Sequence, residues 1–95
     1  MNEKWPTTPE LTEALLRALS RLGESANVSD LDNAVILDIN LSASLLEIKR
    51  SGNRGEIQYR LAWVRTKAKQ NGLVTKEANR YWKLTERGRA MVKNL

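Results

Sequence analysis

The segment from about Glu56 to Asn71 contains no glycine or proline and is followed directly by Gly72. We expect one continuous helix here, because glycine readily adopts the left-handed conformation that ends many helices. Two short segments follow it, "LVT" and "YWKLT", and both have the composition of strands. In the second, Trp82 and Leu84 alternate with polar neighbours and can face a core. A helix that passes directly into a hairpin strongly limits the folds open to 95 residues.

The sequence before this helix predicts further helices. An apolar stripe with helical spacing marks the first of them, with Thr7 or Thr8 as its cap and Gly23 at its end. The stripe consists of Leu11, Leu15, Ala18, Leu19 and Leu22. A strand of one or two residues at Val28 and a second helix capped by Ser29 are expected next. Ser42 is expected to cap a short third helix, and Thr85 a last one in which Met91, Val92 and Leu95 pack.

This order of elements predicts a mainly α fold with a small β-hairpin, the winged helix-turn-helix. The recognition helix would span about 56–71 and the wing 73–84. Residues 9–95 would form the domain and residues 1–8 an N-terminal arm, whose Trp5 is expected to pack against the first helix. The segment 49–55, "KRSGNRG", is expected to be a basic loop.

Charge is distributed unequally along the chain. Residues 1–48 carry eight acidic and three basic side chains, a net charge of −5, whereas residues 49–95 carry three acidic and thirteen basic ones, a net charge of +10. Such a division favours one surface with a positive potential that attracts a polyanion. A solvated basic surface is the alternative, and charge alone does not separate DNA from RNA or a membrane.

Composition excludes several kinds of chemistry. The chain has no cysteine and no histidine, which removes disulfides, thiolate chemistry, the usual zinc ligands and the commonest general base. Asp38, Glu47 and Lys49 resemble part of a magnesium nuclease motif, but Glu47 is expected in a helix and no central sheet is predicted. We therefore expect no catalytic residue, metal or cofactor. No apolar run suits a membrane span or a signal peptide, so a cytoplasmic location is expected.

The helix 56–71 has two faces at 100° per residue. Ile57, Leu61, Val64 and Ala68 form the core side. The opposite side is predicted to read base edges in a DNA groove, because glutamine and arginine match adenine and guanine edges. The candidate groove-reading residues are Gln58, Tyr59, Ala62, Arg65 and Lys69.

A second set of side chains is predicted to contact phosphates, since lysine, arginine and asparagine make most backbone contacts with DNA. They lie in the loop before the helix, at the edge of the core side of the helix and on the wing. The set consists of Lys49, Arg50, Asn53, Arg54, Arg60, Lys67, Lys76 and Arg80. Trp63, in the middle of the helix, is expected to be a half-buried framework residue and not a base-stacking platform.

Several short motifs resemble the N-terminal domain of Mrr-type restriction endonucleases. They are Leu41-Ser42, Ser51-Gly52, Arg60, Trp63-Val64-Arg65, Gly72-Leu73 and Trp82-x-Leu84-Thr85-x-x-Gly88. The resemblance covers about residues 9–93. Lys67-Ala68 departs from it, since the family often has an aromatic residue and a leucine there. The resemblance implies a winged helix that binds DNA ahead of a nuclease domain, and it also makes Trp63 a framework residue.

The sequence therefore predicts a non-enzymatic domain that binds double-stranded DNA, modified or unmodified, as the recognition module of a Mrr-like restriction or defence protein. The sequence does not decide whether the domain is a piece of a longer nuclease or a stand-alone transcriptional regulator. A protein-interaction or dimerisation module, with a nuclease domain or a second copy as partner, is the alternative from another class.

Overall fold

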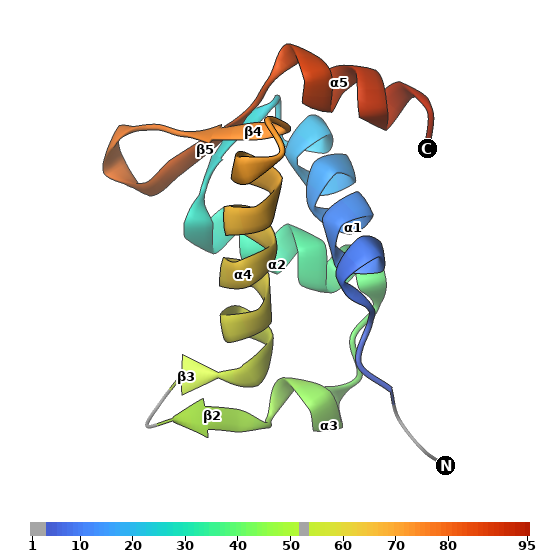
Figure 1. Cartoon of the computed structure of the whole chain (residues 1–95). Coiled ribbons are helices and arrows are strands. Elements are labelled where there is room, and N and C mark those ends of the chain that lie inside the picture. The colour runs from blue at the N-terminus through green and yellow to red at the C-terminus, as the bar shows by residue number, and fades with distance from the viewer. Residues whose placement is uncertain (1–3, 52–53) are drawn as a thin grey trace.

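The computed structural model describes residues 4–51 and 54–95 (Figure 1). The elements are α1 (Thr8–Arg21), β1 (Ser25–Asn27), α2 (Val28–Ile39), α3 (Ala43–Leu46), β2 (Lys49–Ser51), β3 (Arg54–Gly55), α4 (Glu56–Gln70), β4 (Val74–Lys76), a 3-10 turn (Ala78–Arg80), β5 (Tyr81–Leu84) and α5 (Glu86–Lys93). Helices α1, α2 and α4 pack together, and the hairpin β4–β5 projects beyond them (Figure 1). This is the winged-helix arrangement that the sequence predicts.

The sheet of the wing has three antiparallel strands in the order β1-β5-β4. Ala26 and Lys76 lie on either side of Trp82, as their registers place them. Trp82 and Leu84 are buried, whereas Tyr81 and Lys83 are exposed, as the alternation of side chains along a strand requires. Because β1 leads directly into α2, its pairing with β5 attaches the wing to the helices.

Helices α1 and α4 supply most of the core, and α2 and the wing supply the rest. Leu15 and Leu19 of α1 are fully buried together with Ile57 and Leu61 of α4. The predicted core side of α4 is therefore confirmed, and Val64 and Ala68 belong to it as well. Burying a leucine or isoleucine side chain contributes about 1.5–3 kcal/mol, so this contact holds α4 in place.

Four local expectations were wrong. Val28 begins α2, and the strand before it is Ser25–Asn27; Asn27, not Ser29, caps α2, with its side-chain oxygen accepting from Asp30 N at 2.8 Å. The segment predicted as a basic loop contains β2 and β3, which pair as a second small hairpin. Met91 and Leu95 are exposed, and only Val92 of that trio packs against the core.

Two arginines of α1 hold α2 through one carboxylate. The Asp38 oxygens accept from Arg17 Nη2 at 2.7 Å and from Arg21 Nη2 at 2.6 Å. The hydrogen bond from Arg17 lowers the pKa of Asp38, and the bond from Arg21 adds to this against the opposing effect of burial. Asp38 therefore stays ionised at neutral pH and serves helix packing.

The junction between α4, the wing and α5 explains the Leu-Thr-x-x-Gly motif. Gly72 has φ 74°, and Leu73 N donates to Ala68 O at 2.9 Å, which ends α4. The Thr85 hydroxyl donates to Gly72 O at 2.6 Å and accepts from Gly88 N at 3.0 Å. A Cβ at Gly88 would come within 2.2 Å of Leu73 O. Thr85 and Gly88 therefore join three elements, a structural role.

Candidate nucleic-acid interface

Helix α4 presents its outward side between two hairpins. In Figure 1 the wing and the hairpin β2–β3 extend to the same side of α4, one near each end of the helix. The 15 residues of α4 span roughly 22 Å. Gln58 and Lys69 are exposed as expected, and Tyr59 and Ala62 are partly exposed. These four predicted groove-reading residues thus have side chains that a ligand can reach.

Arg65 does not lie on this outward side. It is 8% exposed, and its Nη1 donates to Asp32 Oδ1 of α2 at 2.5 Å. Its guanidinium also lies 5.8 Å from the centre of the Trp82 ring. The expectation of an outward Arg65 was wrong because its partner, Asp32, lies 33 residues earlier in the chain and the helix is turned toward α2. Arg65 connects α2, α4 and the wing.

Trp63, unlike Arg65, is more exposed than the sequence predicted. It is 55% exposed and is not among the side chains that form or pack against the core, so the expectation of a core framework residue was wrong. Together with Tyr59, Ala62 and Thr66 it lines a shallow hollow of about 200 Å³ on the outward side of α4. The exposed side of α4 is therefore centred near Tyr59 and Thr66, about one residue away from the predicted stripe.

The start of α4 carries a charged cluster. Glu56 accepts from Arg50 Nη1 at 3.1 Å and from Arg60 Nε at 2.7 Å. Desolvation acts to raise the pKa of Glu56, but the hydrogen bonds from both arginines outweigh it and lower this pKa. Arg50 also lies over the Tyr59 ring, 3.7 Å from its centre. Two predicted phosphate-binding arginines are thus partly neutralised in the free domain.

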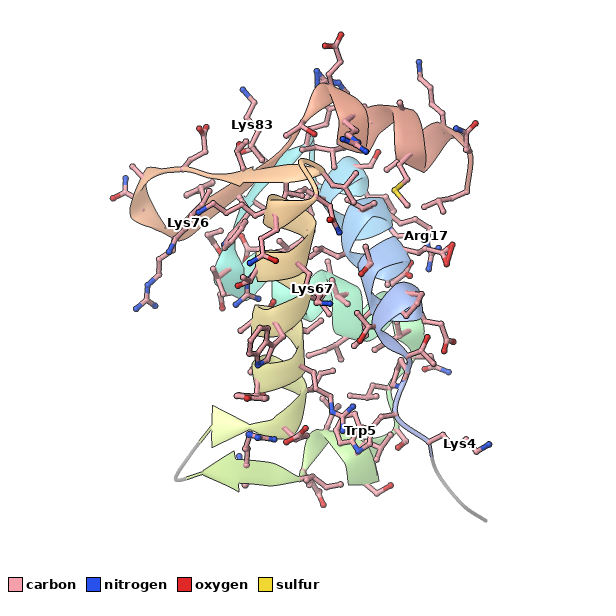
Figure 2. The ribbon with its side chains drawn as sticks, in the orientation of Figure 1. Lys4, Trp5, Arg17, Lys67, Lys76 and Lys83 are labelled. Atoms are coloured by element: carbon pink, nitrogen blue, oxygen red, sulfur yellow. The ribbon has the colours of Figure 1, made fainter. Side chains whose placement is uncertain are left out.

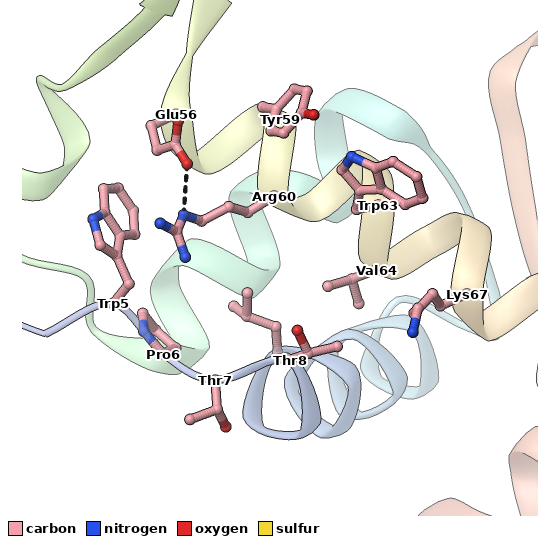
Figure 3. Close-up of a pocket in the computed structure, with 11 residues that line it drawn as sticks. Trp5, Pro6, Thr7, Thr8, Glu56, Tyr59, Arg60, Trp63, Val64 and Lys67 are labelled. Carbon is pink, nitrogen blue, oxygen red and sulfur yellow. Dashed lines mark hydrogen bonds and ion pairs between the residues drawn. The ribbon is translucent and has the colours of Figure 1, made fainter.

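The N-terminal arm reaches α4 as well as α1. Trp5 is partly buried against the core, and Arg60 lies over its ring at 4.5 Å from the centre. Figure 3 shows the two side chains beside Glu56, with Pro6 and Thr7 leading into α1. The arm therefore packs on the recognition helix, which the sequence alone did not indicate.

At the wing tip, the cationic residue Arg80 has an uncommon backbone conformation. Asn79 and Arg80 have φ of 61° and 62°. Two successive left-handed residues match the twist of a tight hairpin, and glycine is strongly preferred at the second of them. Arg80 is exposed there, and Lys76 lies on β4 with its ammonium 5.9 Å from the Trp82 ring centre. Figure 2 shows Lys76 on the wing, away from α1.

A polar groove of about 430 Å³ separates the wing tip from the helices. Gln58 of α4 and Arg80 of the wing line it together with side chains from the start of α2. The further polar lining residues are Asn27, Ser29, Asp32, Asn33 and Asn79. Ser29, Asn33 and Asn79 could not be recognised as site residues from the sequence, because uncharged polar residues follow no spacing that would indicate a shared site.

The remaining predicted residues vary in position. Lys49 and Lys67 are exposed on β2 and α4. Asn53 and the side chain of Arg54 lie outside the described residues. Among residues 4–51 and 54–95, no cluster of acidic side chains suits a metal ion. Nor does this part of the chain contain a helix long and apolar enough to cross a membrane.

A family comparison identifies the domain. The sequence profile described as the Mrr N-terminal domain matches residues 9–94. The chain belongs to the Mrr N-terminal domain family. No curated protein and no solved structure gives a significant match. The predicted resemblance is thus confirmed, and it covers every element from α1 to α5.

Family membership gives the broad setting of this Mrr N-terminal domain. The family comprises an N-terminal domain, which is not the catalytic domain. Membership suggests a role in a Mrr-type restriction system. Within this Mrr N-terminal domain, the Trp-x-Arg motif divides into an exposed Trp63 and a buried Arg65. Its Leu-Thr-x-x-Gly motif forms the junction of α4, the wing and α5.

Proposed function

We propose that this domain binds double-stranded DNA as the recognition module of a Mrr-type restriction or defence protein. The outward side of α4 would enter the major groove, which admits an α-helix. Gln58, Tyr59, Ala62 and Lys69 would contact base edges. Arg65 is left out of this set, because its guanidinium is buried against Asp32.

Cations around this side of α4 would hold the DNA backbone. Arg80 and Lys76 extend from the wing, and Lys49 and Arg50 extend from the β2 side. Arg60 and Lys67 lie on the side of α4 that faces the arm. The observation that carries the proposal is this arrangement: an exposed helix side bordered by basic hairpins at both ends. Phosphate contacts supply most of the non-specific affinity of such proteins.

A salt titration tests the proposal. With a 20-base-pair duplex, we expect affinity to fall steeply between 50 and 200 mM salt, by about 100-fold or more if four or more phosphates are contacted. Lys76→Ala should weaken binding to all sequences about equally and reduce the slope of log K against log salt by about one. Lys93→Ala on α5 is the matched control. An affinity that does not change with salt would refute phosphate contacts, and a tight dimer without DNA affinity would favour an interaction module.

Substitution of Arg80 should change stability and binding in opposite directions. Arg80→Gly relieves the cost of a side chain in the left-handed region, which is about 1 kcal/mol, so the melting temperature should rise by several degrees. The same change removes a wing cation, so duplex affinity should fall and the salt slope should decrease by about one. Arg80→Lys keeps the charge and the strain and is the control. Unchanged duplex affinity of Arg80→Gly would exclude Arg80 from the interface.

Neutralising Glu56 should strengthen DNA binding. Glu56→Gln releases Arg50 and Arg60 from their shared carboxylate, so we expect duplex affinity to rise a few-fold at low salt, with a steeper salt dependence. Glu13→Gln on α1 changes the net charge equally, away from α4, and should have little effect. Equal gains in both variants would show that only net charge matters.

A further inference from the structure

A second groove lies on the other side of α4 from the wing tip. It separates α4 from the N-terminal arm and the start of α1, and its volume is about 510 Å³. In Figure 3, Trp5, Pro6 and Thr8 border it on one side, and residues of α4 border it on the other. Ligand pockets commonly range from about 300 to 1,000 Å³, so this groove has room for a nucleotide.

Part of the wall of the groove is aromatic. Trp5, Tyr59 and Trp63 all line it. Trp63 is 55% exposed, although α4 is already held to the core by Ile57, Leu61, Val64 and Ala68. Folding therefore does not explain why an indole occupies this position. Exposed tryptophan is characteristic of binding surfaces, where a rigid ring supplies contact area.

The groove also has the charge for an anion. Lys67 and Arg60 line it, and Lys67 has no ion-pair partner within the described residues. The Glu56 carboxylate lines the groove too but is paired with Arg60, so Lys67 is the lining cation best placed to meet an anion. The hydroxyls of Thr7 and Thr8 add hydrogen-bonding groups. A flat aromatic ring with an attached phosphate combines both requirements, and stacking of a base on an aromatic side chain contributes on the order of 1–3 kcal/mol.

The groove is continuous with the proposed DNA surface. Tyr59 and Trp63 line both this groove and the shallow hollow on the outward side of α4. We infer that the groove binds one unpaired nucleotide of a DNA strand that lies across α4, with its base against Trp63 and its phosphate near Lys67. This inference rests on the proposed function and names a further feature of the DNA, an unpaired or unstacked base.

The test compares two labelled duplexes of identical sequence, one fully paired and one with a single unpaired nucleotide at its centre. We expect the wild-type domain to bind the second about tenfold more tightly. Trp63→Ala should bring the ratio of the two affinities to about one, and Trp63→Phe should retain part of it. Leu37→Ala, at an exposed apolar residue of α2 outside both grooves and the hollow, is the control and should keep the ratio. Deoxythymidine monophosphate is added as a competitor to distinguish a free nucleotide from a strand.

Each result has one meaning. Equal wild-type affinities for the two duplexes, or a preference that persists in Trp63→Ala, would overturn the inference. Competition by micromolar deoxythymidine monophosphate would also overturn it, because the site would then bind a free nucleotide. Salt-dependent binding of the paired duplex remains the measure of the proposed function. Binding of only the duplex with the unpaired nucleotide would refute that function and support the groove.

Discussion

Arg65→Ala is expected to destabilise the domain by about 3–5 kcal/mol. Arg65 and Asp32 both have side chains that are 10% exposed, and removal of the guanidinium would take an ion-pair partner from a buried carboxylate. The variant also loses the packing of the long side chain near Trp82. Because small domains are stable by about 5–15 kcal/mol, such a loss is large. Urea denaturation of the two proteins measures it.

A second substitution separates charge from packing. Asp32→Asn removes the carboxylate charge, so the double variant Arg65→Ala/Asp32→Asn should be more stable than Arg65→Ala alone. Relative affinities across a panel of DNA sequences should stay unchanged in Arg65→Ala at a temperature where it is folded. A stable Arg65→Ala variant with altered base preference would contradict the structural role and restore Arg65 as a base reader.

Gly88→Ala is also expected to destabilise the domain, by a different mechanism. The added Cβ would meet Leu73 O at 2.2 Å and Leu84 Cδ1 at 2.9 Å. Leu73 O is a backbone atom that also accepts from Thr85 N at 3.0 Å, so it cannot move without disturbing the junction. Overpacking of this kind costs about 1–3 kcal/mol and occasionally more. The melting temperature should fall by about 10 °C or more, as thermal unfolding would show.

Gly23→Ala is the matched control for Gly88→Ala. Gly23 has φ 89°, but nothing lies within 4 Å of an added Cβ. That substitution should cost only the backbone strain, about 1–2 kcal/mol. Thr85→Ala removes the cap of α5 and should cost about 1 kcal/mol. A Gly88→Ala variant as stable as wild type would show that α5 can move away from Leu73.

The spacing of apolar residues in α4 predicts part of the burial pattern of this helix. The apolar spacing correctly identified Ile57, Leu61, Val64 and Ala68 as the core side. At 100° per residue, Arg65 lies roughly 70° from the centre of that side and Trp63 roughly 130° from it, so the spacing alone already favoured Arg65 as the more buried of the two. Size and polarity favoured a buried tryptophan and an exposed arginine. The structure has the reverse arrangement, since Asp32 of α2 supplies a buried partner for Arg65.

In the candidate site, too, some features could be predicted from the sequence and others could not. Lys76 and Arg80 were assigned to the wing from the sequence, since the strand pattern around them is local. The polar groove between the wing tip and α2 was not predictable, because Ser29 and Asn79 are 50 residues apart in the chain. Neither was the groove beside Trp63, which depends on how the arm packs on α4.

The sequence by itself determined the winged-helix class, the ends of α1 and α4 at their caps and glycines, the positive charge of the second half and the family. These features depend on local propensity, periodicity and composition, which each residue carries with it. Only the tertiary structure decided which side of α4 is free, that Glu56 occupies two of the arginines, and why Gly88 cannot carry a side chain. Those outcomes depend on atoms from distant segments meeting within a few ångströms, and no local pattern encodes that distance.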